Sequence, residues 1–306
     1  MSIHTPQQLQ PDADEVNSSP VHQPVLLDQV VELLAPQLGQ TYLDVTAGYG
    51  GHARVLAKHV GGYDHVTLVD RDSNAVAALK DVEQQGATLI HDDFAHAAEL
   101  FVEEGRTVDM VLVDLGVSSP QLDVATRGFS FTRPGPLDMR MDDRQATTAA
   151  NLANRLKERD LAQLIADFGQ EPRGKAARIA RAIVRARPLR TTDDLARAVL
   201  TAHHGPHQRI HPATRTFQAL RIALNDELGQ IRRMLDCLPK LLNSGGRVAI
   251  ISFHSLEDHL VKHWLKEHSY GLLAEFEPLP PPVFGRDSDV SNPRARSAIL
   301  RAAVKK

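Results

Sequence analysis

A glycine-rich turn at the end of an apolar segment constrains the fold of this chain most. Thr41 to Val45 predicts a buried strand, and the sequence Asp44-Val-Thr-Ala-Gly-Tyr-Gly-Gly-His52 then leads into a helix expected over 52–59. The next expected strand, over 66–70, ends in an aspartate. A glycine-rich turn from strand to helix, with an acidic residue about 20 positions later, holds a ribose-bearing cofactor in Rossmann-like sheets. The turn therefore predicts a parallel sheet that binds a ribose.

The rest of the chain continues this alternation of strands and helices. Val108-Asp-Met-Val-Leu-Val-Asp114 is apolar enough to form a strand that is buried on both faces. The alternation of strands and helices stops after Asp114 and resumes near Thr216. From there the sequence predicts one long helix through Leu242, a strand ending at Phe253 and an alternating edge strand over 296–304. The other expected elements are a strand over 87–91 and helices over 24–34, 74–80 and 97–103. This order predicts an α/β fold with a doubly wound, Rossmann-like sheet.

A largely helical segment interrupts the sheet units after Asp143. Its charge and its helical period differ from those of its surroundings, which is typical of an inserted domain. The sequence predicts a sheet domain over 21–143 and 214–306, and an inserted helical domain over 144–213 that contacts the substrate. Residues 1–20, rich in Gln, Pro, Asp and Ser, are expected to form a flexible tail.

Composition narrows the class of protein. No apolar run approaches the ~20 residues that span a bilayer, and Met1 to Pro20 lacks the basic start and apolar middle of a signal peptide. Both observations favour a cytoplasmic protein. Cys237 is the only cysteine, so an intrachain disulfide and a thiolate metal cluster are excluded, and we expect it to be buried. The net charge of -3 means that any nucleic-acid site must be a local basic patch.

The spacing of the glycine turn distinguishes between cofactors. Dinucleotide enzymes usually carry G-x-G-x-x-G, whereas this chain has Gly48, Gly50 and Gly51, with Asp44 four residues before the first. The arrangement resembles the D-x-x-x-G-x-G motif of class I methyltransferases, which use S-adenosylmethionine (SAM), and it disfavours an NAD enzyme. A glycine turn alone is weak evidence, because an ordinary tight loop between strand and helix has the same appearance.

A second polar segment follows the strand at 108–114. Asp114-Leu-Gly-Val-Ser-Ser-Pro-Gln121 lies where the acceptor meets the methyl group in this architecture. An exocyclic base amine has its lone pair delocalised into the ring, so oxygen acceptors must hold its hydrogens and position the nitrogen. Asp114, Ser118 and Ser119 are the candidate catalytic residues. The alternative is that Ser-Ser-Pro only turns the chain.

The ordered series of motifs resembles one family. Residues 22–304 look like the bacterial 16S ribosomal RNA cytosine-N4 methyltransferases, the RsmH or MraW proteins. The resemblance implies a SAM-dependent enzyme that methylates one cytidine in the decoding centre of the small ribosomal subunit. The segments that carry it are His22–Asp28, Gly50–His52, Asp70–Asp72, Asp114–Asp123, Arg127–Phe131, Gly135–Asp142, His211–Gln218, Ser252–Asp258 and Asn292–Ser297.

The resemblance also implies roles for single residues. The SAM contacts of the family fall on Gly50, Gly51 and His52 in the turn, on Asp70 at the ribose, on Phe94 beside the adenine, and on Asp114 and Gln121 near the methionine half. Direct transfer from the sulfonium to the amine needs no covalent enzyme intermediate. We therefore expect no cysteine nucleophile.

Two groups of residues are candidates for RNA contact. In the expected insert, Lys175, Arg178, Arg181 and Arg185 recur at helical spacing opposite two isoleucines, which suits a phosphate backbone. The alternative is an ordinary solvated helix face. Beside Arg127, the rings of Phe129 and Phe131 can stack on a base that has left its helix. They can equally be core aromatics that hold the loop.

The histidines give weaker signals. The cluster over 203–211 invites a metal site, but no second ligand cluster supports it, and methyl transfer from a sulfonium needs no Lewis acid, so no metal is expected. His254 follows the strand ending at Phe253 and can orient the cytosine or accept a proton. Hydrogen bonding to loop backbone is an equally good reading of His254.

Two rival functions stay open on the sequence alone. A methyltransferase of the same fold that acts on protein or DNA would keep the cofactor motifs and lack the basic stripe and the Arg127–Phe131 loop. A non-catalytic SAM-binding assembly factor would bind cofactor and RNA without turnover. The sequence leaves the oligomeric state open, with a homodimer among the options.

Overall fold

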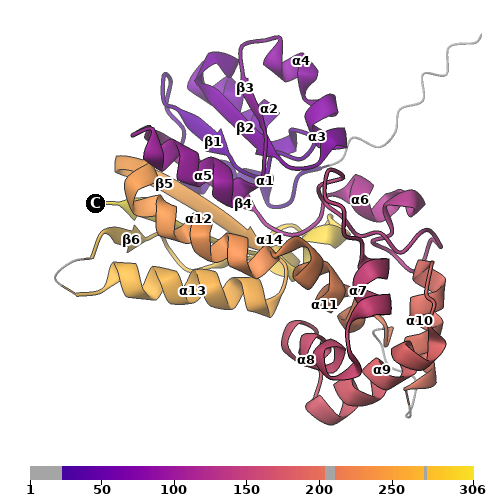
Figure 1. Cartoon of the computed structure of the whole chain (residues 1–306). Helices are drawn as coiled ribbons and strands as arrows, with labels where there is room; N and C mark the ends of the chain where they lie inside the picture. The colour runs from indigo at the N-terminus through magenta and orange to yellow at the C-terminus, as the bar shows by residue number, and fades with distance from the viewer. Residues whose placement is uncertain (1–22, 204–210, 272–273) are drawn as a thin grey trace, which may run out of the picture.

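The computed structural model describes residues 23–203, 211–271 and 274–306, and the expected N-terminal tail lies outside them. A mixed sheet of eight strands forms its centre (Figure 1). The strands are β1 Tyr42–Asp44, β2 Val66–Asp70, β3 Thr88–His91, β4 Val108–Asp114, β5 Leu242–Ser252, β6 Phe276–Pro278, β7 Val283–Phe284 and β8 Ile299–Lys305. The helices are α1 Leu27–Leu34, α2 Gly51–Val60, α3 Ser73–Ala78, α4 Lys80–Glu83, α5 Phe94–Glu103, α6 Ser119–Asp123, α7 Ala149–Arg155, α8 Glu158–Phe168, α9 Arg173–Ala186, α10 Thr192–Thr201, α11 Thr214–Asn225, α12 Glu227–Leu241, α13 Ser255–Ser269 and α14 Gly285–Ser288.

The order of strands confirms the predicted α/β fold. The sheet runs β3-β2-β1-β4-β5-β8-β6, with β7 also paired to β8. The first five strands are parallel and β8 runs antiparallel to β5. The chain leaves β1 towards β2 on one side and returns to β4 on the other, so the strand order reverses between β1 and β4. Open α/β sheets bind ligands outside the carboxyl ends of the strands at such a reversal.

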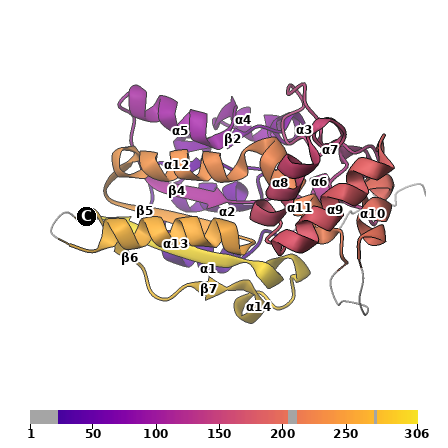
Figure 2. The same cartoon turned by 60° about the horizontal axis from the view of Figure 1, so that its bottom comes forward.

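Helices cover both faces of this sheet (Figures 1 and 2). One core packs α5, α12 and α13 against it, and the other packs α1, α2 and α4. Strand β4 alternates between them: Val111 and Val113 belong to the first core, and Met110 and Leu112 to the second. A parallel strand that is buried on both faces needs this continuous apolar sequence.

A third core belongs to a helical unit made mainly of α7 to α10 (Figure 2). It includes Ile165 of α8, Ile179 of α9 and Leu195 of α10, and it extends to Phe129 before the expected insert and Leu224 after it. Helix α11 is shared, because its Leu224 packs in the helical unit while its Ile222 packs in the sheet domain. The 144–213 boundary stays a prediction.

Polar contacts tie this unit to the sheet. The guanidinium of Arg71, just after β2, donates to the carbonyl of Asn225 at 3.1 Å. The side chain of Asn225 in turn donates to the carbonyl of Met139 and accepts from the backbone N–H of Met141, both at 2.9 Å. The helical unit and the sheet therefore meet through hydrogen bonds of Asn225, beside the carboxyl end of β2.

Two expected elements differ in the structure. The predicted single helix from Thr216 to Leu242 is two helices, because Asp226 adopts a left-handed conformation (φ 47°) and ends α11. The predicted edge strand is β8, but it lies inside the sheet, since β6 and β7 pair with its outer side. Cys237 is buried as expected. Within the described ranges, no helix is long and apolar enough to cross a membrane.

Candidate active site at the carboxyl ends of the strands

The glycine turn joins β1 to α2 and lies beside the end of β2. The backbone N–H of Gly48 donates to Asp70 at 2.7 Å, which holds the turn against β2. Gly50 has φ +79° and caps α2, a conformation that side chains rarely adopt. A Cβ on Gly51 would lie 2.6 Å from the ring of Pro24. Gly50 therefore needs glycine for its backbone conformation, and Gly51 needs it for its close packing against Pro24.

Asp70 is held rigidly at the end of β2. One carboxylate oxygen accepts the Gly48 N–H, and the other accepts the N–H of Asp72 at 2.8 Å. Burial raises the pKa of Asp70, while these two backbone donors lower it. Each oxygen keeps a free lone pair direction, so the carboxylate can accept ligand hydroxyls from a fixed position. Phe94, the first residue of α5, is buried beside the same edge after β3.

Two carboxyl groups, those of Asp44 and Asp114, lie at the ends of the two strands between which the strand order reverses. Asp44 accepts from Tyr42 Oη at 2.8 Å and from the Thr46 N–H at 3.1 Å, and burial raises its pKa to about 6. Asp114, at the end of β4, has its pKa raised well above the usual range, first by burial and then by the charges of Asp44 and Glu257. Its Oδ1 is buried without a hydrogen-bond partner among the described residues. Such an acceptor is suited to hold a donor from outside the protein.

His52 does not neutralise Asp114. Its Nε2 lies 3.0 Å from the carbonyl of Val25, which only accepts, so Nε2 carries the proton. Burial lowers the pKa of His52 to about 4, and the ring is neutral at pH 7. Its Nδ1, 3.8 Å from Asp114 Oδ2, is therefore an acceptor facing another acceptor. Asp114 therefore has no fixed positive charge beside it from His52.

The segment after β4 is fixed by Gln121 and Asp72. Ser118 is the N-cap of α6, and its N–H donates to Gln121 Oε1 at 2.9 Å. The Gln121 amide nitrogen donates to Asp72 Oδ2 at 2.8 Å. Ser119 is buried at the start of α6. Both ends of the Gln121 amide are thus used inside the protein, so this side chain positions the loop beside the cofactor loop.

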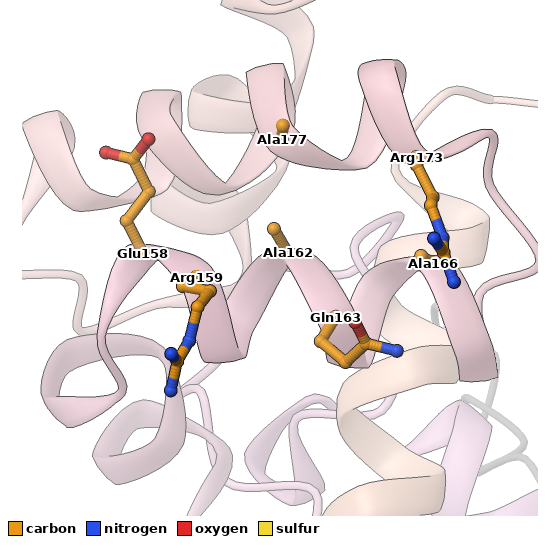
Figure 3. A pocket seen from close by; sticks show the side chains of 7 residues that line it. All are labelled: Glu158, Arg159, Ala162, Gln163, Ala166, Arg173 and Ala177. Atoms are coloured by element: carbon orange, nitrogen blue, oxygen red, sulfur yellow. The ribbon is translucent and has the colours of Figure 1, made fainter.

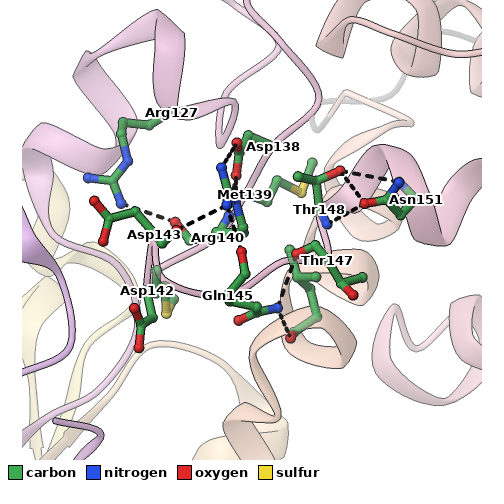
Figure 4. A network of polar contacts seen from close by, with 12 residues as sticks. Arg127, Asp138, Met139, Arg140, Asp142, Asp143, Gln145, Thr147, Thr148 and Asn151 are labelled. Carbon is green, nitrogen blue, oxygen red and sulfur yellow. Dashed lines mark hydrogen bonds and ion pairs between the residues drawn. The ribbon is translucent and has the colours of Figure 1, made fainter.

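Arg127 lies in a different environment from the one the sequence suggested. Its Nη1 donates to Asp72 Oδ2 at 2.7 Å and its Nη2 donates to the carbonyl of Arg140 at 3.0 Å, with only 17% of the side chain exposed. Figure 4 shows it within a loop network in which Arg140 also binds Asp138 and the carbonyl of Gln145. We expected Arg127 to contact RNA, but its guanidinium is committed to an internal ion pair, and we leave it out of the RNA surface.

The two loop phenylalanines also turn inward. Phe129 is buried in the core of the helical unit. Phe131 stacks on His211 with ring centroids 4.5 Å apart and meets Phe217 edge-on at 5.1 Å. This geometry matches the alternative that they hold the loop, and it gives Phe129 no free face for a base. Phe131 is partly exposed, and its contact with RNA stays a prediction.

His254 caps α13 from its N-cap position. Its Nδ1 accepts the N–H of Glu257 at 3.4 Å, and its Nε2 lies 3.2 Å from Glu257 Oε1. Burial lowers the pKa of His254 to about 4. Nδ1 is used in capping its own helix, whereas Nε2 makes no hydrogen bond with the described residues. A role of His254 at the cytosine stays a prediction.

Behind His254 lies a buried charged cluster. Arg221 donates to both oxygens of Glu227 at 2.7 Å. Glu227, His254 and Glu257 offer ligand atoms within 4.8 Å of one another, close enough for a metal ion. Arg221 already binds Glu227 bidentately, however, so the charge of that carboxylate is balanced by the protein itself. Of the histidine cluster at 203–211, residues 204–210 lie outside the described part of the chain.

The buried carboxyl of Glu257 should make the stability of the protein depend on pH. Burial raises its pKa from 4.5 to about 7 in the folded protein. The folded protein therefore keeps a proton that the unfolded chain loses, so this group makes stability fall as pH rises from about 4.5 towards 7. Glu257→Gln removes the effect, which is worth about 3 kcal/mol across that window. Denaturant unfolding at several pH values measures the effect. As the pH rises, the free energy of unfolding of the variant should increase relative to that of the native protein. A difference in unfolding free energy that does not change with pH would contradict a raised pKa of Glu257.

The basic stripe on α9 is only partly free. Ile179 and Ile183 are buried opposite it, as expected. Lys175 donates to Glu171 at 2.9 Å and is 22% exposed, while Arg181 donates to Glu158 at 3.2 Å. Arg178 and Arg185 are more available at the surface: both are exposed, and Arg178 donates to a carbonyl of its own helix. Their RNA contact stays a prediction.

Asp72 is the main residue that sequence reasoning missed. It caps α3 by accepting the N–H of Asn74, and it also binds Gln121 and Arg127. Its side chain thus joins the end of β2, the loop after β4 and the Arg127 loop. The available signal was the second acid of Asp70-Arg-Asp72, which we quoted only as part of a motif.

Comparison with known proteins agrees with this geometry. The sequence profile of the MraW methylase family matches residues 19–306. A "Ribosomal RNA small subunit methyltransferase H" of Acidobacterium capsulatum is 46% identical over 295 residues, which cover 93% of this chain and 98% of that protein. The proteins of the same name from Methylococcus capsulatus and Synechocystis are each 44% identical, covering 92% and 93% of this chain and 99% and 93% of theirs. The chain belongs to the MraW methylase family.

Proposed function

We propose that this protein transfers the methyl group of SAM to the exocyclic N4 amine of a cytidine in 16S ribosomal RNA of the small subunit, in the cytoplasm. The observation that carries the proposal is Asp114 Oδ1 at the carboxyl end of β4, beside the glycine turn. It is a buried acceptor that has no hydrogen-bond partner among the described residues. Membership of the MraW methylase family and the names of the curated relatives support the same substrate.

The residues around the reversal of strand order fit SAM. Gly48, Gly50 and Gly51 would let the cofactor approach the backbone, Asp70 would accept the ribose hydroxyls, and Phe94 would flank the adenine. His52 and Asp114 would lie near the methionine half, with Gln121 holding the adjacent loop. When bound, SAM supplies a methyl group on a sulfonium, which leaves as a neutral thioether.

The acceptor amine needs orientation more than activation. A carboxylate that accepts an amine hydrogen favours a tetrahedral nitrogen with a free lone pair, which is a positioning and electrostatic effect. Asp114 is the group placed for this role, and Ser118 and Ser119 lie on the same loop. The proton lost after transfer would pass to Asp114 or to solvent. Cys237 is buried in α12, and no metal ion is required by this chemistry.

Gly51→Ala tests the cofactor site. The added Cβ would lie 2.6 Å from Pro24, so the turn or the N-terminal segment must shift. We expect the dissociation constant for SAM, measured by titration calorimetry, to rise about tenfold or more, which corresponds to about 1.4 kcal/mol. The control is Gly174→Ala in α9, where a Cβ meets nothing within 4 Å. Unchanged affinity in Gly51→Ala would place SAM elsewhere.

A comparison of possible methyl acceptors tests which class of molecule is the substrate. The protein would be incubated with labelled SAM and either small ribosomal subunits from cells lacking this methyltransferase, duplex DNA, or ribosomal proteins. Label in the RNA alone supports the proposal. Label in DNA or protein would overturn it, and SAM binding with no transfer to any acceptor would point to a non-catalytic role.

A further inference from the structure

A groove separates α8 from α9 in the helical unit. It has a volume of about 430 Å³ and is open to solvent. Its floor is formed by the short side chains of Ala162, Ala166 and Ala177, and Arg159 and Arg173 lie towards its two ends (Figure 3). Methyl groups cannot fill the space between the helices, so a neutral, shallow surface lies between two cations.

Two arginines, Arg159 and Arg173, and one acid, Glu158, line this groove. The side chain of Arg159 is 90% exposed, and the ion pair that the described residues give it is with Asp160, at 3.2 Å. Arg173 is exposed, and the described residues give it no ion pair. The acidic residue on the lining, Glu158, is paired with Arg181. The remaining polar residue, Gln163, donates to Asp167. Arg173 is therefore available to an anion, and Arg159 can exchange its exposed pair with Asp160 for one.

The position of Arg173 runs against helix stability. It is the first residue of α9, whose first turn has no acidic residue and whose N-cap is a proline. The carboxylate just before the helix, that of Glu171, is buried and paired with Lys175. A cation at a helix N-terminus is unfavourable for the helix, because the free N–H groups there carry partial positive charge. The same N–H groups and the guanidinium together attract an anion. Helix α8 has the ordinary arrangement, with Glu158 and Asp160 in its first turn.

We propose that this groove binds the sugar-phosphate backbone of the ribosomal RNA substrate, at a contact separate from the site at β4. Arg159 and Arg173 bind successive phosphate groups, and the alanine floor receives the ribose between them. The inference rests on the proposed function, because it requires RNA as the substrate. It places two main phosphate contacts on residues outside the stripe of Lys175, Arg178, Arg181 and Arg185.

The double variant Arg159→Gln, Arg173→Gln tests the groove. Because these residues touch neither the cofactor nor the reacting amine, we expect KM for small subunits to rise about tenfold or more with kcat unchanged. Loss of two phosphate contacts should also make the slope of log KM against log salt shallower by about 2. Ala162→Phe, which fills the floor without changing charge, should raise KM and leave the salt slope as it is. The matched control is Arg232→Gln, an exposed arginine on α12.

The outcomes separate this inference from the proposed function. If the native protein does not label the subunit RNA, the proposed function fails and so does the groove. If the native protein labels the RNA and the double variant keeps the native KM and salt slope, only the groove is wrong. A fall in kcat at constant KM would also overturn it, because it would assign these arginines to chemistry.

Discussion

Asp114→Asn should lower kcat by at least about 100-fold, the scale seen when one preorganised electrostatic group is removed from an active site. The asparagine keeps the shape of the side chain, but it cannot offer a charged acceptor to the amine hydrogens, and its own N–H groups would compete for space with them. Initial rates at saturating small subunits and SAM measure the effect. The matched control is Asp236→Asn, an exposed aspartate on α12 that should keep native activity.

The same variant should not be less stable. Burial raises the pKa of Asp114 well above its usual range, so the folded protein disfavours the carboxylate that catalysis uses. Replacing it with a neutral amide removes this cost, and the free energy of unfolding should be equal or higher. An inactive variant with native or greater stability supports a functional role for the group. An Asp114→Asn protein that keeps native kcat would remove Asp114 from the mechanism.

Arg221→Met should destabilise the fold by about 3–5 kcal/mol, the usual cost of leaving one buried charge without its partner. Glu227 is bound bidentately by Arg221, with side chains 5% and 16% exposed, and Glu257 lies in the same cluster. Loss of the guanidinium leaves two buried carboxyl groups together. Adding Glu227→Gln should recover much of the stability, because it removes the uncompensated charge.

Denaturant unfolding of both variants measures this effect. The surface pair Arg54–Asp81 is a matched control, because it is also bidentate, at 2.7 and 2.9 Å, but its side chains are 38% and 53% exposed. Arg54→Met should cost less than about 1 kcal/mol. If Arg221→Met costs no more than Arg54→Met, the cluster is not buried as described.

Local sequence patterns predicted the sheet well, because parallel strands that are buried on both faces consist of continuous runs of apolar residues. Val108–Asp114 and the glycine turn are of this kind, and both have the expected places. The break at Asp226 could not be predicted in the same way, since it depends on one aspartate adopting a left-handed conformation between two helices that both bury apolar faces. The inner place of β8 depends on its pairing with β6 and β7. Both strands are too short to leave a recognisable pattern in the sequence.

Side-chain direction limited the prediction of the site. Backbone positions such as Gly51 and strand-end acids such as Asp70 are fixed by the element to which they belong, so their places followed from the sequence. Arg127 and Phe129 stand in a long loop, where a sequence does not show which side faces inward; the structure turns both into the protein. Charge alone also favoured the α9 stripe. The spacing of four residues between Glu171 and Lys175 is a sequence signal for one of its ion pairs, whereas the pairing of Arg181 with Glu158 became visible only in three dimensions.

The most direct test of the central claim is the identity of the methylated nucleoside. Purified protein would be incubated with tritiated SAM and small ribosomal subunits from cells lacking this methyltransferase, and the digested RNA analysed by chromatography and mass spectrometry. We predict that the label is found in N4-methylcytidine and is lost with Asp114→Asn. Label in another nucleoside, or no label from protein that binds SAM, would contradict the account.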